Sequence, residues 1–273
     1  MSIQQLFYTL QLADNALING HRLSEWCGHG PVLEQDIALS NISLDHLGQA
    51  RSLYQYAAAQ MNALPMDAKL NLFASVALND KISKGETIEE DDLAFLRDSW
   101  DFKNLLLVEQ PNEDWAYTIV RSFLFDVFNL YLFNSLKNSK EEQIAAIAEK
   151  SLKEVTYHIR WSSEWMIRLG DGTEESHRRL QQAFNDRWMF SGEMFEASNA
   201  DKEMLQEGIG VDLTLIKNQW QQHISKVVEE ATIMLPTNNW MQTGGKQGKH
   251  TEQLGYLLTE LQFMQRAYPN MEW

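Results

Sequence analysis

The placement of proline is the sequence feature that most constrains the fold of this chain. Proline costs about 3 kcal/mol inside a helix, so prolines that fall only between helically periodic stretches mark the ends of long uninterrupted helices. The five prolines are Pro31, Pro65, Pro111, Pro236 and Pro269. No segment sustains the alternation of apolar and polar residues, with β-branched enrichment, that is typical of a half-buried strand. The sequence therefore predicts an all-α protein with essentially no sheet.

The long predicted helices come in two pairs. The first pair covers residues 3–27 and 33–62, and the second pair covers residues 112–138 and 141–169. A long connection over about 63–111 separates the two pairs. Two helical hairpins joined by a long crossover are typical of a ferritin-like four-helix bundle.

Shorter segments complete the expected architecture. In the crossover, residues 70–78 and 93–100 are predicted to be helical, and the acidic run 89–92 is predicted to be a solvated loop or a helix start. The C-terminal part is predicted to contain three helices: 173–198 capped by Thr173, one that is capped by Asp212 and stops before Pro236, and 251–267. We expect a single ferritin-like domain over 1–273, with a crossover insertion at about 63–111 and a C-terminal helical extension over about 173–273.

The charge balance excludes several classes of partner. Acidic residues number 38 against 23 basic ones, which gives a formal net charge of −15. Nucleic acids and anionic membrane surfaces attract clustered Lys and Arg, so neither is an expected partner. No apolar run approaches the roughly 18 residues of a membrane span, and the N-terminus lacks the pattern of a signal peptide. The single cysteine, Cys27, fits a reducing compartment, so we expect a cytoplasmic protein.

Carboxylates occur along the long helices at intervals that suit a metal-binding bundle. Ferritin-like di-metal proteins place one carboxylate on a helix and an acidic-x-x-His pair on the next, and they repeat this arrangement in the second hairpin. Here Asp14 and Asp126 lie on the first and third predicted helices, and Asp45 and Glu154 lie on the second and fourth. These four acids are expected to point toward the bundle axis.

The histidines of that pattern are missing. Gly48 and Tyr157 stand where the second and fourth helices need a ligand. His46 is close in sequence, but a one-residue offset turns a side chain by about 100° around a helix. His158 lies one turn after Glu154 and can share its face. Two interpretations stay open: a vestigial site without metal, or a carboxylate-rich metal site.

The acids of a vestigial site need compensation. Buried carboxylates without partners are costly, so hydrogen bonds or cations, such as Arg51 or Lys153, are expected to hold them.

A glycine- and lysine-rich loop precedes the last predicted helix. Backbone N–H groups of Gly244 and Gly245, together with Lys246 and Lys249, form a possible contact for an anion or a partner. The alternative is a tight helix-entry turn that needs glycine for positive φ.

Several motifs spread over the whole chain carry a family resemblance. They are Leu-Ser-Glu-Trp-Cys-Gly-His at 23–29, Asn-Ile-Ser-Leu-Asp-His-Leu-Gly-Gln-Ala-Arg at 41–51, Asn-Leu-Leu-Leu-Val-Glu-Gln-Pro-Asn at 104–112, Lys153-Glu154 with Tyr157-His158, and Thr-Gly-Gly-Lys at 243–246 with Gly248 and His250-Thr251-Glu252. With these motifs the chain resembles the C subunits of bacterial phenylacetyl-CoA epoxidases. His46 departs from the family pattern, in which an apolar residue is expected.

The resemblance implies a structural subunit of a monooxygenase. In such complexes the working di-iron centre belongs to the homologous A subunit, which pairs with the C subunit. A small B subunit and a reductase with flavin and iron–sulfur groups complete the assembly, which uses dioxygen and NADPH-derived electrons to epoxidise phenylacetyl-CoA. The resemblance thus implies no catalytic residue and no cofactor in this chain, and an isolated chain can form a homodimer. The alternative is a metal-dependent ferritin-like oxygenase that uses its own carboxylate-rich site, so whether the chain is itself an enzyme stays open.

Overall fold

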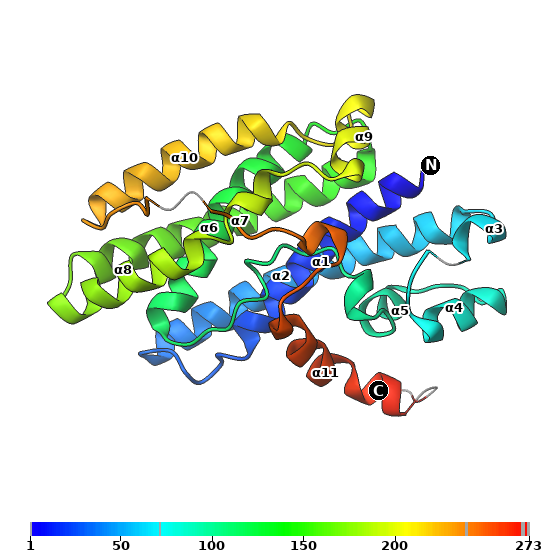
Figure 1. The fold of residues 1–273 in the computed structure, drawn as a ribbon, viewed down its shortest axis with the longest axis horizontal. Coiled ribbons are helices and arrows are strands. Elements are labelled where there is room, and N and C mark those ends of the chain that lie inside the picture. Colours follow the sequence, from blue (N-terminus) through cyan, green and yellow to red (C-terminus); the bar gives the residue numbers. More distant parts are fainter. Residues whose placement is uncertain (1, 71, 238–239, 269–270, 272–273) are drawn as a thin grey trace.

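The computed structural model of the chain describes residues 2–70, 72–237, 240–268 and 271. Four long helices form its centre: α1 (Ile3–Ser24), α2 (Leu33–Ala63), α6 (Trp115–Leu136) and α7 (Glu142–Gly170). α1 packs along α2, α6 packs along α7, and α2 meets α7, so the two hairpins lie together as a bundle (Figure 1). The predicted all-α fold is confirmed, and the described ranges contain no strand.

The long helices begin where their sequences provide a cap. The side chain of Ser2 accepts a hydrogen bond from the backbone N–H of Gln5 at the start of α1, and Asp114 does the same for Tyr117 at the start of α6. These bonds satisfy N–H groups that have no partner inside the helix.

Helix α6 is the central helix of the bundle. Contrary to the expectation that no apolar run approaches a membrane span, this helix is long and apolar enough to cross one, but 83% of its apolar window is buried inside the protein. A helix that is apolar all round suits either a lipid or a protein interior. Here its neighbours are α7, α8 (Glu174–Trp188) and α10 (Leu213–Glu230), which cover it.

The crossover is partly helical, as predicted, but its helices differ in position. It contains the short helices α3 (Met66–Lys69), α4 (Val76–Ser83), α5 (Glu90–Phe95) and η1 (Ser99–Asp101). The prediction of a helix over 70–78 was wrong, because the Ser75 side chain caps Leu78 and makes the helix begin at Val76. Position 71 lies outside the described residues.

The acidic run of the crossover is a helix start rather than a loop. The side chains of Glu89 and Asp92 each accept a backbone N–H of the other residue, which forms a capping box at the first turn of α5. The predicted helix over 93–100 ends earlier, at Phe95, and η1 follows as a separate turn.

The C-terminal part covers the second hairpin and then packs against α1 and the crossover. Thr173 and Asp212 cap α8 and α10, as predicted. The predicted helix over 173–198 ends at Trp188, where the Ser191 hydroxyl bonds the Trp188 carbonyl and diverts the chain. This part also contains η2 (Gly192–Phe195), α9 (Asn199–Glu207), which was not predicted, η3 (Gly245–Gln247) and α11 (Glu252–Ala267).

Candidate functional site

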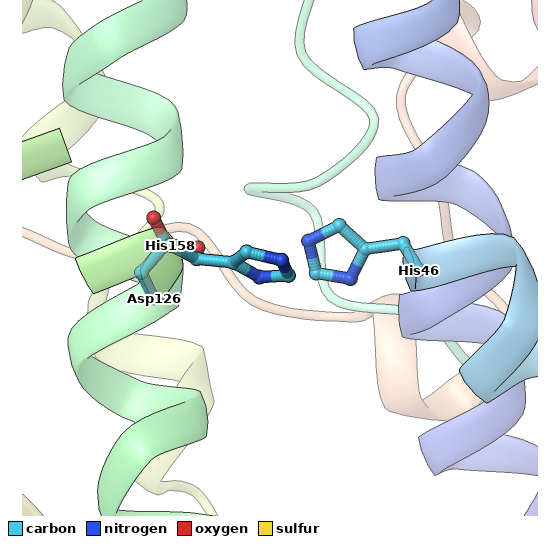
Figure 2. Close-up of side chains that lie close together, drawn as sticks. All are labelled: His46, Asp126 and His158. Carbon is cyan, nitrogen blue, oxygen red and sulfur yellow. The ribbon is translucent and has the colours of Figure 1, made fainter. Parts of the chain in front are cut away.

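Three side chains that can ligate a metal meet inside the bundle. His46 comes from α2, Asp126 from α6 and His158 from α7, and each is at most 1% exposed. Each offers a ligand atom, and the three atoms lie within 4.8 Å of one another. Figure 2 shows the imidazole of His46 reaching from one side toward His158 and Asp126 on the other. The two hairpins of the bundle therefore both contribute to this cluster.

Helical periodicity explains why the two histidines point inward. On α2, His46 lies on the buried row formed by Leu39, Ile42, Gln49 and Leu53. On α7, His158 belongs to a second such row with Ser151, Val155 and Ser162. Burial of these rows against the other helices fixes the rotation of α2 and α7 about their axes.

The same rotation moves four of the expected positions away from the bundle axis. Asp45 and Glu154 are partly exposed, while Gly48 and Tyr157 are exposed, Tyr157 by 39%. The residue that precedes or follows an inward one lies about 100° further around the helix. A histidine placed at 48 or 157 would therefore face the surface of the bundle.

Each imidazole of the cluster contacts a polar side chain through Nε2, and Figure 2 shows Nε2 of His46 pointing toward His158. His158 Nε2 lies 2.9 Å from a carboxylate oxygen of Asp45, and His46 Nε2 lies 3.0 Å from the side-chain amide of Asn19 on α1. Nδ1 of His158 and Oδ2 of Asp126 are buried and have no hydrogen-bond partner among the described residues, whereas His46 also has the Gln49 side chain beside it.

Burial also shifts the ionisation of the cluster. Desolvation raises the pKa of Asp126 to about 6, although His158 and Arg121 oppose the shift. Desolvation and the neighbouring His158 lower the pKa of His46 well below its usual value. Both effects favour the neutral forms of these groups unless a cation is bound beside them.

The carboxylate of Asp14, the other fully buried acid of the predicted set, is already paired with other groups of the protein. Its carboxylate forms an ion pair with Arg97 from the crossover, and it accepts hydrogen bonds from the Tyr54 hydroxyl at 2.5 Å and the Lys103 backbone N–H at 2.7 Å. Both charged side chains are completely buried. Arg97, rather than the expected Arg51 or Lys153, therefore compensates this charge, and Arg51 is 72% exposed beside Glu90.

Glu154 lies at the floor of a groove between α2 and α7. It accepts a hydrogen bond from the Gln49 side chain at 2.9 Å, and Gln49 lies beside His46. The groove has a volume of about 490 Å³ and is lined by Gly48, Ser52, Tyr56, Lys150 and other residues of both helices. Glu154 is thus separated from the cluster by a buried amide.

These residues do not fit a di-iron centre. Such a centre needs a carboxylate and an acidic-x-x-His pair from each hairpin. Here Asp14 is bound by Arg97, Glu154 is bound by Gln49, and positions 48 and 157 face outward. The remaining inward ligands are too few for two irons.

The glycine- and lysine-rich loop is a structural turn that binds an anion of the protein itself. The backbone N–H groups of Gly244 and Gly245 donate to Glu193 Oε1 at 2.7 and 2.6 Å. Lys246 reaches the Glu196 carbonyl and the Asp201 carboxylate, whereas Lys249 is exposed. The N–H groups that could have held an external anion are thus already used.

Two important residues escaped the sequence analysis for different reasons. For His46, the ferritin-like spacing points to Asp45 and Gly48 instead, although the apolar row of α2 places His46 inward. Arg97 lies in an irregular crossover and is distant in sequence from Asp14, so no local signal linked the two.

Comparisons with known proteins point to one family. The profile described as phenylacetic acid catabolic protein matches residues 2–273. The C subunit of the 1,2-phenylacetyl-CoA epoxidase of Escherichia coli (strain K12) is 43% identical over 266 residues, which span 97% of this chain and 98% of that protein.

Proposed function

The chain belongs to the phenylacetic acid catabolic protein family, and we propose that it is a non-catalytic structural subunit of a phenylacetyl-CoA 1,2-epoxidase that serves aerobic phenylacetate degradation in the cytoplasm. In this role it pairs with the catalytic A subunit and stabilises it. The B subunit and the flavin and iron–sulfur reductase complete the complex. The electrons come from NADPH, and the di-iron chemistry belongs to the A subunit.

The state of the inward carboxylates is the main support for a non-catalytic role. In a working centre, Asp14 and Glu154 would each face a metal. Here a buried arginine and a glutamine amide take their place. A guanidinium that is fully buried against a carboxylate is not readily displaced, because removing it leaves an uncompensated buried charge.

Exposed apolar residues on the outer surface of α2 are the second support for a partner protein. Leu33, Ile37 and Leu44 recur along its outer row and are 70%, 54% and 64% exposed. Monomeric proteins rarely leave large contiguous apolar surfaces uncovered, and such surfaces mark interaction sites. We propose that this row of α2 is covered by the A subunit.

Co-purification tests this pairing. The A subunit with an affinity tag is co-expressed with the untagged chain, either wild type or with Ile37→Glu and Leu44→Glu. We expect the wild-type chain to co-purify and the α2 variant to lose the A subunit, because two charges would be buried in an apolar contact.

A variant elsewhere on the surface provides the control. Leu215 of α10 is 62% exposed, so Leu215→Glu changes a comparable side chain on another helix. This variant should keep the A subunit. Retention of the A subunit by the α2 variant would contradict the assignment of this face, and failure of the wild-type chain to bind would contradict the pairing itself.

Turnover by the chain alone tests the alternative, a metal-dependent oxygenase with its own site. We expect the isolated chain to epoxidise no phenylacetyl-CoA after incubation with iron and a reductant. Turnover that requires metal and is lost in Asp126→Ala, or a content of two irons per chain, would support the alternative and overturn the structural role.

A further inference from the structure

We propose that His46, Asp126 and His158 bind one divalent transition-metal ion, which links the two hairpins of the bundle. The inference goes beyond the proposed function, since the metal would be part of the structural subunit itself and not of the oxygenase centre.

The unpaired atoms of the cluster are the first argument. Nδ1 of His158 and Oδ2 of Asp126 are buried without a hydrogen-bond partner among the described residues. Buried polar atoms in native proteins nearly always have a partner, and an unpaired one calls for an ion or a water. Here two such atoms belong to residues of the cluster, whose ligand atoms lie within 4.8 Å of one another.

The outer contacts of the two rings are the second argument. Metal-ligating histidines commonly give their other ring nitrogen to a carboxylate, a carbonyl or another polar group, which fixes the ring and its tautomer. His158 Nε2 has this contact with Asp45, and His46 has it with the Gln49 side chain. A hydrogen bond from His158 Nε2 to Asp45 leaves a lone pair on the inner Nδ1 atom. His46 presents Nε2 to the cluster, and the Asn19 side chain, which lies 3.0 Å from that atom, is the contact that a metal would replace.

The ligand atoms of the cluster need to move only a short distance toward one another to bind a metal. Bonds of about 2.1 Å in a tetrahedral site place neighbouring ligand atoms about 3.4 Å apart. The ligand atoms of the cluster already lie within 4.8 Å, so side-chain rotations of the order of 1 Å bring them together. Three protein ligands leave a fourth position for a water molecule.

The donor set indicates the class of metal. Two imidazoles and one carboxylate suit Zn²⁺, Fe²⁺ and Co²⁺, whereas Ca²⁺ and Mg²⁺ prefer sites made of oxygen. The charge of the site also favours a cation. Asp126 has no ion pair with a described lysine or arginine, so a divalent ion would compensate its buried carboxylate.

The position of the site gives the metal a structural role. His46 belongs to the first hairpin and the other two ligands belong to the second, so one ion would hold α2 against α6 and α7. Gln49 and Glu154 line the groove between α2 and α7, and Gln49 also lies beside His46, so one side chain separates the groove from the cluster.

Zn²⁺ titration of the metal-free chain tests the proposal. The purification tag is removed, the protein is stripped with a chelator, and bound Zn²⁺ is counted after equilibrium dialysis. We expect one Zn²⁺ per chain, a Zn²⁺-dependent rise in Tm, and, with Co²⁺ as a second probe, the visible absorption of a four- or five-coordinate ion. His46→Leu and Asp126→Asn should abolish all three effects.

Two further variants make the result specific. His223→Gln is the matched control, because His223 is a partly buried histidine of α10 that contacts Tyr131 instead of the cluster, and it should keep one Zn²⁺. Asp45→Ala removes the outer contact of His158 without touching a ligand, and we expect it to weaken Zn²⁺ affinity about 10- to 100-fold. This graded loss is measurable even where a ligand variant fails to fold.

Three outcomes would overturn the proposal: a folded wild-type chain that takes up no Zn²⁺, equal uptake by wild type and His46→Leu, or two ions per chain. Failure of the metal site leaves the proposed pairing untouched, and turnover by the isolated chain contradicts the non-catalytic role without counting against the metal.

Discussion

Asp14 and Asp126 are buried carboxylates of the same bundle that differ in their compensation. Asp14 faces a permanent positive charge, Arg97, and two further donors. Asp126 faces two imidazoles, and its Oδ2 atom has no hydrogen-bond partner among the described residues. A site with a fixed cation excludes a metal, whereas a site that faces two imidazoles can accept one. The chemistry of each site therefore follows from the side chains that face the acid.

The Arg97–Asp14 pair carries a clear stability prediction. Arg97→Met leaves the Asp14 carboxylate buried without a cation, which costs roughly 3–5 kcal/mol. Arg51→Met is the control, because the exposed pair with Glu90 contributes at most about 1 kcal/mol. Urea unfolding of both variants measures the difference. Equal midpoints for the two variants would show that Asp14 does not depend on Arg97.

At the scale of the helices, the sequence predicted more of the regular parts than of the irregular ones. The four bundle helices follow from apolar periodicity and from prolines at their ends, and their bounds agree within a few residues. The crossover and the segment after Trp188 depend on distant contacts, such as Glu193 with Leu106 and Gly244, which no local pattern encodes. The spacing along the sequence identifies the four acids. It does not give the rotation of α2 and α7 about their own axes, and this rotation decides which side chains enter the site.

That rotation leads to a prediction about the missing histidines. In the double variant Gly48→His and Tyr157→His, both new side chains should face the surface of the bundle, since positions 48 and 157 are exposed and no atom lies within 4 Å of a Cβ at 48. We expect iron uptake per chain to stay at the wild-type value after anaerobic reconstitution. An increase to two irons per chain would mean that these positions face the axis.

The glycine loop gives a second prediction at this scale. A Cβ at Gly245 would lie 2.2 Å from the backbone oxygen of Asn104. Gly245→Ala therefore displaces the loop from the segment around Asn104 and lowers the free energy of unfolding by about 1–3 kcal/mol. Gly255 of α11 has open space, and Gly255→Ala should stabilise the helix by about 1 kcal/mol. Thermal unfolding compares the two. A Gly245→Ala variant as stable as the Gly255→Ala variant would contradict the close approach.

At the scale of the whole molecule, the interior of a ferritin-like bundle contains polar groups that do not form a di-iron ligand set. A buried ion pair, a glutamine amide and a two-histidine cluster lie between its helices. The outer row of α2 carries the apolar residues that we assign to the partner. The net charge of −15 fits this division, since it keeps nucleic acid and membrane away but leaves an apolar face for a protein.

Reconstituted turnover tests the central claim most directly. Epoxidation of phenylacetyl-CoA is measured with the B subunit, the reductase and NADPH, for the A subunit alone, for this chain alone and for the two together, with iron counted in each preparation. We predict that only the pair sustains turnover, with the di-iron content assigned to the A subunit. Turnover by this chain without the A subunit, or full activity of the A subunit without this chain, would contradict the account.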